Sequence, residues 1–184
     1  MSELRIEPLA LAGPVLLRAA VTQQPPARFT YHYSERDFAA LGLPSRFVQS
    51  HASRYATRHT VRGLHFQTTP QTKLVRVAQG SIHDVVVDIR RQSPTYGRHV
   101  SVELAAGDWT QLLVPPGFAH GFCTLEADTE VAFLLDDYND PARLRGLLWN
   151  DPRLGVAWPC GDAPGWLPEI DCGWPTLASL LSPF

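Results

Sequence analysis

Short strand-like segments separated by turn residues dominate the middle of this chain. The segments are rich in Val, Ile, Leu and Phe and cover residues 73–79, 81–90, 99–104, 110–114, 121–125, 130–135 and 145–149. Gly80, Gly97, Gly107 and the sequence Pro115-Pro116-Gly117 lie between them. β-Branched and aromatic residues favour strands, and Gly and Pro favour the turns that end strands. The pattern therefore predicts an all-β fold, an antiparallel sandwich or barrel.

Helical signals are sparse. Ser34 is a suitable N-cap for a helix over 35–41, with Asp37 in the first turn and Gly42 just past the end. A second short helix is expected over 176–181. We expect one domain over residues 1–184, because no repeat or linker divides the chain. Within it, 1–45 would form an N-terminal arm and helix, 46–150 the barrel, and 151–184 an irregular segment with the second helix.

The bulk composition excludes several classes of partner. The chain has 184 residues, of which 45% are hydrophobic and 18% charged, so it can bury a core. Its formal net charge of -2 gives no general attraction to nucleic acid or to an anionic membrane. No segment contains the ~20 consecutive apolar residues that a membrane-spanning helix needs. We therefore expect neither a nucleic-acid partner nor a membrane partner.

The cysteines and the N-terminus favour a cytoplasmic location. Cys123, Cys160 and Cys172 are an odd number without CxxC spacing, which indicates neither a disulfide framework nor a thiolate metal site. Free thiols suit a reducing compartment. The first residues also lack a continuous apolar stretch behind a basic one, so a signal peptide is not expected.

Two sequence stretches carry the residues best suited to chemistry. Residues 62–67 read Arg-Gly-Leu-His-Phe-Gln, with Lys73 on the next strand-like segment, and His120 follows the Pro-Gly turn at 115–117. An imidazole can accept a proton near neutral pH, and a fixed cation can stabilise the oxygen of an enolate. The combination is suited to removing a proton from a carbon next to a carbonyl group.

The spacing around His120 resembles that of cupins, which are double-stranded β-helix (jelly-roll) proteins. Gly107, Pro115, Gly117 and His120 match the second cupin motif, G(X)5-7PXG(X)2H. The first motif keeps His65, but Gln67 occupies its second histidine position and Lys73 its glutamate position. An ammonium group has no lone pair and repels a dication, so we expect no metal. A metal-dependent cupin dioxygenase is the less favoured alternative.

Several co-linear motifs over residues 31–175 resemble the dTDP-4-dehydrorhamnose 3,5-epimerase family. They lie at 62–67, 73–77, 84–97, 115–122 and 149–159. The resemblance implies a homodimeric jelly roll that acts without a cofactor on a nucleotide-diphosphate 4-keto-6-deoxyhexose. Such an enzyme removes the proton next to the C4 ketone and returns a proton to the opposite face.

The resemblance also implies roles for individual residues. His65 corresponds to the general base, Asp171 to its carboxylate partner and Lys73 to the cation that steadies the enolate oxygen. Arg62, Gln49, Ser53 and His120 fall on substrate-binding positions. Asp171 has an alternative interpretation as a helix-capping carboxylate before Pro175. Arg90 and Arg91 could grip a phosphate, but a solvated strand end is the favoured interpretation.

This sequence departs from the family at positions near the ligand. Phe133 occupies the position of a tyrosine that acts as general acid, and losing such an acid typically costs on the order of 10²- to 10⁴-fold in rate. Tyr138 or water could replace it. In the N-terminal arm, which often reaches a site in the partner subunit, Phe29 keeps an aromatic contact. His51 replaces a common asparagine and is grouped with the substrate-binding residues.

The favoured function is thus an epimerase of a nucleotide-diphosphate 4-keto sugar, including one restricted to a single carbon such as C3. A related isomerase or tautomerase of a 4-keto sugar is an alternative, because Phe133 has no proton to give. A catalytically impaired homologue that only binds a nucleotide sugar is another.

Overall fold

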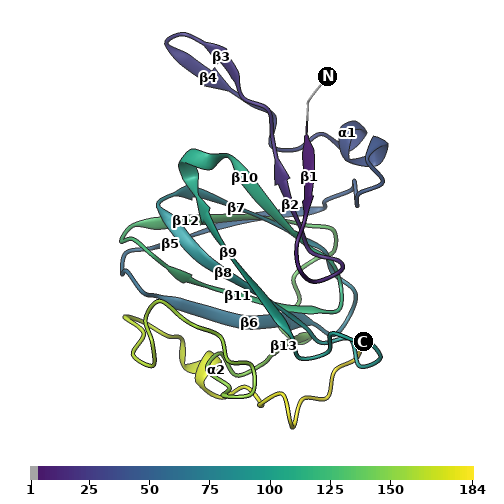
Figure 1. Cartoon of the computed structure of the whole chain (residues 1–184), viewed down its shortest axis with the longest axis vertical. Helices are drawn as coiled ribbons and strands as arrows, with labels where there is room; N and C mark the ends of the chain where they lie inside the picture. The colour runs from purple at the N-terminus through teal and green to yellow at the C-terminus, as the bar shows by residue number, and fades with distance from the viewer. Residues whose placement is uncertain (1–3) are drawn as a thin grey trace.

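Two antiparallel β-sheets face each other in the computed structural model, which describes residues 4–184 (Figure 1). The six-stranded sheet has the order β1 (Arg5–Pro8), β2 (Val15–Arg18), β10 (Thr110–Val114), β7 (Lys73–Gln79), β12 (Thr129–Leu135), β5 (Gln49–Tyr55). The five-stranded sheet has the order β13 (Leu144–Gly146), β6 (Val61–Gln67), β11 (Phe118–Thr124), β8 (Ser81–Asp88), β9 (His99–Ala105).

The strand order is that of a jelly roll. The set β5-β12-β7-β10 belongs to one sheet and the set β6-β11-β8-β9 to the other, so the chain changes sheet at most steps. All neighbouring strands in the two sheets are antiparallel. Eight strands in two such sets form the double-sheet jelly roll that cupins share. The predicted all-β, cupin-type fold is confirmed.

The alternation of side chains along each strand builds the core. Val75 and Val77 of β7 and Val86 of β8 face inward and pack in one cluster with Phe118 and Phe122 of β11. Val85 and Val87 of β8 point to the opposite face of their sheet, where they pack with Leu64, Trp149 and Trp158. Residues 151–184 cover this outer face of the five-stranded sheet, as the yellow segment in Figure 1 shows.

The first predicted helix is present and the second is not. Helix α1 spans Glu35–Ala40, and the Ser34 hydroxyl accepts a hydrogen bond from the backbone N–H of Asp37 at 3.4 Å. The prediction of a helix over 176–181 is wrong, because that segment forms only a turn from Thr176 to Ser179. The two hydroxyl side chains lie 3.1 Å apart and compete locally with helical hydrogen bonding. A short helix, α2, spans Glu169–Cys172 instead.

The N-terminal segment differs from the arm predicted over 1–45. Strands β1 and β2 join the six-stranded sheet beside β10, with Leu16 and Leu17 buried. Only the hairpin of β3 (Thr22–Gln24) and β4 (Ala27–Phe29) projects from the body, at the top of Figure 1. Four-residue strands carry too few alternations for the sequence pattern to reveal them.

The boundaries of three other strands also differ from the prediction. β8 ends at Asp88, before the two arginines, and β13 covers only Leu144–Gly146. β11 begins at Phe118, so His120 lies within a strand rather than in the turn before it. The chain also forms a 3₁₀ turn, η1, at Ala106–Asp108.

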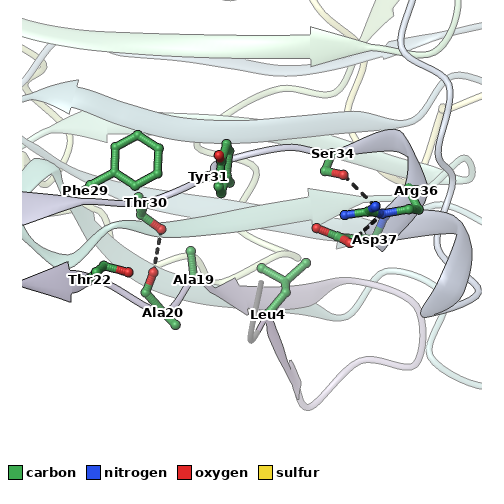
Figure 2. Close-up of a pocket in the computed structure, with 10 residues that line it drawn as sticks. All are labelled: Leu4, Ala19, Ala20, Thr22, Phe29, Thr30, Tyr31, Ser34, Arg36 and Asp37. Atoms are coloured by element: carbon green, nitrogen blue, oxygen red, sulfur yellow. Dashed lines mark hydrogen bonds and ion pairs between the residues drawn. The ribbon is translucent and has the colours of Figure 1, made fainter. Parts of the chain in front are cut away.

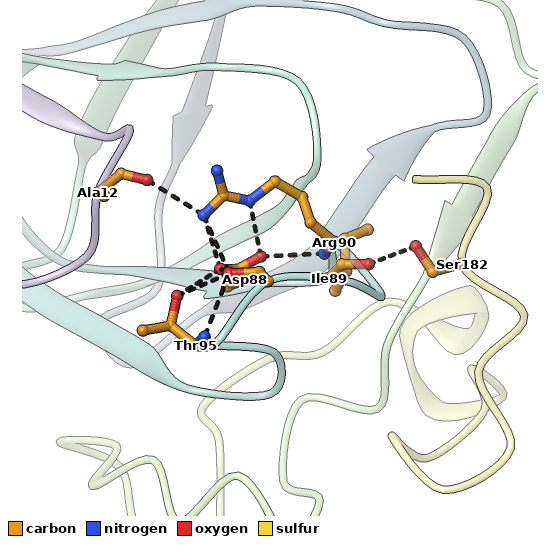
Figure 3. Close-up of polar contacts among 7 residues, drawn as sticks. Ala12, Asp88, Ile89, Arg90, Thr95 and Ser182 are labelled. Carbon is orange, nitrogen blue, oxygen red and sulfur yellow. Dashed lines mark hydrogen bonds and ion pairs between the residues drawn. The ribbon is translucent and has the colours of Figure 1, made fainter.

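Arg90 is partly exposed, but its guanidinium is engaged by Asp88 and is not free to hold phosphate. It donates to Asp88 through Nε at 3.0 Å and through Nη2 at 2.7 Å, and its guanidinium lies 4.5 Å from the centroid of the Phe118 ring (Figure 3). Ser93 and Thr95 also donate to the fully buried Asp88 carboxylate, each at 2.6 Å. Burial opposes ionisation, but these hydrogen bonds hold the pKa of Asp88 well below its usual range. The expectation of a solvated strand end is wrong for Arg90 and correct for the exposed Arg91.

Within residues 4–184, every helix is too short and too polar to cross a lipid bilayer.

Candidate active site

A cavity of about 170 Å³ lies between the two sheets and gathers most of the predicted site residues. The six-stranded sheet contributes His51 and Ser53 from β5, Lys73 from β7 and Phe133 from β12. The five-stranded sheet contributes Arg62 and His65 from β6 and His120 from β11. Residues far apart in the sequence therefore meet because the jelly roll places β5, β6, β7, β11 and β12 around one hollow.

His65 pairs with Asp171 at one wall of this cavity. His65 Nε2 lies 2.5 Å from Asp171 Oδ1, and the carboxylate is completely buried. This contact fixes the proton of the neutral ring on Nε2 and leaves Nδ1 as the nitrogen that can accept a proton. Burial lowers the pKa of His65 below 6.5, Lys73 and Arg62 lower it further, and Asp171 opposes them. A neutral imidazole at neutral pH is what a general base requires.

Asp171 is held in place by its own neighbours. Its Oδ2 accepts the backbone N–H of Gly63 at 2.9 Å, and its Oδ1 accepts the indole N–H of Trp174 at 3.0 Å. Although burial favours the protonated acid, the hydrogen bond from His65 and these two bonds keep the pKa of Asp171 below 3.8. The interpretation of Asp171 as a mere cap is wrong, because its carboxylate reaches His65 and Gly63 from within α2.

Two glycines let strands β6 and β11 approach closely beside His65. A Cβ atom on Gly121 would lie 2.5 Å from the backbone oxygen of Arg62, and one on Gly63 would lie 2.6 Å from Gly121 Cα. The register of the two strands also shifts between His120 and Phe122. Such an irregularity next to a site re-aims the neighbouring side chains.

Lys73 places its ammonium group in the same cavity. Its Nζ donates to the backbone oxygen of His65 at 3.2 Å. Burial lowers its pKa from 10.5 to about 8, and the nearby Asp84 carboxylate opposes this shift. Lys73 is therefore mostly protonated at neutral pH and can face a developing oxyanion.

A second buried pair, His120 with Asp84, was not predicted from the sequence. His120 Nε2 lies 2.9 and 3.0 Å from the two Asp84 oxygens, and both side chains are buried. The sequence did contain an indication of this pair, because Asp84 is an acidic residue next to the apolar side chains of β8. Sequence reasoning also missed Tyr55 and Asn139, which line the cavity as well.

Four predicted residues do not line this cavity: the fully buried Asp171, which contacts His65, and Gln49, Tyr138 and Phe29. The Gln49 side chain accepts the backbone N–H of Asn139 at 2.7 Å and does not itself line the cavity. Tyr138 is 67% exposed and does not line the cavity. Phe29 lies in the projecting hairpin. The structure of a single chain thus does not bring Gln49, Tyr138 and Phe29 to His65.

Phe29 instead lines a larger cavity of about 530 Å³ between the hairpin and α1 (Figure 2). Tyr31, Ser34 and Arg36 line it too, and the Phe29 and Tyr31 rings meet edge to face at 4.9 Å. This cavity holds no histidine, lysine or other pair suited to proton transfer from carbon. The smaller cavity beside His65 is therefore the candidate active site.

The arrangement can deprotonate a carbon next to a carbonyl group. His65 Nδ1 is free to act as a base, Asp171 is placed to stabilise an imidazolium, and the Lys73 ammonium is placed to face an oxygen on which charge develops. Among residues 4–184, no three His, Cys, Asp or Glu side chains are grouped to hold a metal ion. The Nε2 atoms of His65 and His120 already contact the carboxylates of Asp171 and Asp84.

Comparison with known proteins agrees with this chemistry. Residues 8–179 match the profile of the family described as dTDP-4-dehydrorhamnose 3,5-epimerase. The Pseudomonas aeruginosa protein of that name is 41% identical over 158 residues, which cover 85% of this chain and 87% of that protein. A dTDP-4-dehydrorhamnose 3-epimerase from Streptomyces niveus is 34% identical over 161 residues, 86% of this chain and 77% of that protein.

A solved structure has the same fold over nearly the whole chain. The dTDP-6-deoxy-D-glucose-3,5-epimerase from Legionella pneumophila, in complex with dTDP-4-keto-L-rhamnose, superposes with a TM-score of 0.90. It is 32% identical, and the match covers 97% of this chain and 95% of that one. This chain therefore belongs to the dTDP-4-dehydrorhamnose 3,5-epimerase family.

Proposed function

We propose that this protein epimerises a nucleotide-diphosphate 4-keto-6-deoxyhexose, with a dTDP sugar as the first candidate. The observation that carries the proposal is that His65, paired with the buried Asp171, and Lys73 line one cavity. Relatives that act on such sugars share the family, and the Legionella structure holds a dTDP-4-keto sugar.

In the proposed reaction, His65 Nδ1 takes the proton from the carbon next to the C4 ketone. The electrons of the C–H bond move into the carbonyl group, and the enolate oxygen is met by the Lys73 ammonium. Asp171 accepts the Nε2 proton of His65 in a hydrogen bond throughout and stabilises the imidazolium. Arg62, Ser53 and His120 hold the substrate from the surrounding wall. Both steps are proton transfers with no net change of oxidation state, so this scheme uses no oxidant or reductant.

The site would be completed by a second copy of the chain. Phe29 is 44% exposed on a hairpin that projects from the body, so it is available to reach a neighbouring subunit. We therefore expect a homodimer in which each hairpin contributes Phe29 to the partner's cavity. Sedimentation should give twice the chain mass of 20.4 kDa, and a monomer at active concentrations would contradict this part. Free thiols at all three cysteines support a cytoplasmic location.

The test is proton exchange in deuterium oxide. The protein is incubated with dTDP-4-keto-6-deoxyglucose, and deuterium at C3 and C5 is followed by NMR and mass spectrometry. We expect incorporation that requires His65, so His65→Asn should reduce it by about 10²- to 10⁴-fold. Absence of exchange at both carbons with several nucleotide sugars would overturn the proposal, and exchange that survives His65→Asn would overturn the assignment of the base.

The same experiment decides which carbon reacts. A relative from Streptomyces niveus is named a 3-epimerase, and Phe133 here has no proton to donate. Inversion with deuterium at C3 alone would identify a single-carbon epimerase, and inversion with deuterium at both carbons would identify a 3,5-epimerase. A product with the ketone at another carbon would identify the isomerase alternative.

A further inference from the structure

We propose that His51 is the acid that returns a proton to the substrate carbon on the face opposite His65. The inference rests on the proposed function. An epimerase removes a proton from one face of the carbon and must deliver a proton to the opposite face. It assigns a role that goes beyond the base His65 and the cation Lys73, which by themselves only make the enolate.

The sheet geometry places His51 across the cavity from His65. His51 lies on β5 of the six-stranded sheet and His65 on β6 of the five-stranded sheet, and both side chains line the cavity between the sheets. His51, Ser53 and Tyr55 alternate along β5 and all three face inward. The two imidazoles therefore approach a bound sugar ring from opposite walls.

Phe133 fixes the position of the His51 ring. The two residues are direct register partners in the β12–β5 pair, and their rings are stacked with centroids 4.8 Å apart and planes inclined by 16°. Within the described residues, no hydrogen bond occupies either ring nitrogen of His51. The ring is thus oriented by stacking, and its N–H groups remain available to a ligand.

The neighbouring side chains differ from His51 in the proton that they can offer, and Tyr55, whose hydroxyl keeps its own proton while it accepts a hydrogen bond, is the rival donor. The His120 ring is held by Asp84, and Phe133 has no transferable proton. The Tyr55 hydroxyl accepts a hydrogen bond from Arg62 Nη1 at 3.3 Å, and Arg62 Nε lies 3.9 Å from Asp171. Arg62 therefore draws the Tyr55 hydroxyl toward the His65–Asp171 side of the cavity.

The proton balance of the proposed step is simple. His65 Nδ1 takes the proton from one face of the carbon, and the C–H electron pair becomes the C=C bond of the enolate. The pair then forms a new C–H bond on the other face with a proton from an N–H of protonated His51. His51 ends neutral and His65 ends protonated. Because the His51 side chain is exposed at the cavity rim, water can reload it.

The surroundings of His51 make its protonated ring a stronger acid than an ordinary imidazolium. Partial burial lowers its pKa below 6.5, and the Lys73 charge lowers it further. Other ionisable groups share the cavity with it, namely Arg62 and His65 on β6, His120 on β11 and Tyr55 on β5 itself. Inversion should therefore become slower as the pH rises through the pKa of His51, since only the protonated ring can donate to carbon in this scheme.

The first experiment separates inversion from exchange in deuterium oxide, with dTDP-4-keto-6-deoxyglucose as the probe. His51→Asn should lose inversion by about 10²- to 10⁴-fold. It should still exchange the proton with retention, because His65 and Lys73 remain. His51→Phe keeps an aromatic ring against Phe133 but has no proton, so it should behave like His51→Asn if proton donation rather than stacking matters.

The second experiment moves the proton donor to the neighbouring strand. In the His51→Asn background, Phe133→Tyr adds a hydroxyl group to the ring that stacks on His51 in the wild type. This double variant should invert the substrate at least ten times faster than His51→Asn alone. The alkaline limb of kcat/KM for inversion should move from below pH 6.5 to about 8, where Lys73 becomes limiting.

Inversion within threefold of wild type in both His51→Asn and His51→Phe would overturn the proposal. Loss of inversion with retained exchange in Tyr55→Phe or Tyr138→Phe instead would assign the acid to that tyrosine. Failure of the proposed function looks different, because wild type would then show no exchange at all. Thermal unfolding of each variant should stay within a few degrees of wild type, since His51 is exposed.

Discussion

His65 Nε2 and Asp171 Oδ1 lie 2.5 Å apart, although 106 positions separate the two residues in the sequence. The contact joins β6 of the five-stranded sheet to the short helix α2 in the C-terminal segment. The same carboxylate accepts the backbone N–H of Gly63. The C-terminal segment therefore contacts the proposed base directly, in addition to covering the sheet.

Asp171→Asn should lower deuterium exchange by about 10²- to 10⁴-fold, because the amide cannot stabilise the His65 imidazolium. Asp171 raises the pKa of His65 against the effect of burial, so its loss should move the acidic limb of the pH profile to lower pH. Exchange rates measured between pH 4 and 8 test this. An unchanged limb would show that Asp171 does not tune His65.

Lys73 should set the alkaline limit of proton exchange. Its pKa of about 8 means that the ammonium is lost as the pH rises through that value, and the enolate oxygen then lacks its cation. The His51→Asn variant isolates this effect, because its exchange cannot depend on the protonation of His51. Its exchange rate should fall above about pH 8. Lys73→Met should lower exchange by about 10²- to 10³-fold at pH 7 and remove this limb. A limb that persists in Lys73→Met would contradict the assignment.

Gly121→Ala should destabilise the protein and disturb the site, because the new Cβ would meet the backbone oxygen of Arg62 at 2.5 Å. We expect a loss of about 3 kcal/mol in the free energy of unfolding, since backbone cannot move aside as a side chain can. Gly107→Ala is the matched control, with no atom within 4 Å of the new methyl group. Urea denaturation compares the two, and equal stabilities would refute the close-approach argument.

Asp88→Ala should lower the free energy of unfolding by about 2–4 kcal/mol, because it leaves Arg90, Ser93 and Thr95 without their shared acceptor. Arg91→Ala, at the adjacent exposed position, should change it by less than about 0.5 kcal/mol. The pKa of Asp88 is lowered in the folded state. Its contribution is therefore fully present above the ordinary pKa of 3.8 and is lost progressively as the pH falls from that value toward the lowered pKa of the folded state. Wild type and Asp88→Ala should thus converge in stability at acid pH.

The sequence alone determined the fold class and the identity of the chemical groups. Segments rich in Val, Ile and Leu, separated by Gly and Pro, predicted strands β7, β11 and β12 of the cavity but not β5, because side chains of a strand alternate between its two faces and β5 is mostly polar. The motifs around His65, Lys73 and His120 predicted which residues would meet. Helix α1 followed from the Ser34 cap, a strictly local interaction.

Only the tertiary structure decided the features that depend on distant segments. The short strand β2 forms because β10 offers it a partner, and β1 in turn pairs with β2. Residues 176–181 stay non-helical, with the backbone N–H of Leu177 bonded to the Asp151 carboxylate. The Asp84–His120 pair, the exclusion of Tyr138 from the cavity and the stacking of His51 on Phe133 are likewise invisible in a linear pattern. A sequence specifies which side of a strand a residue occupies, whereas the packing of two sheets specifies what it faces.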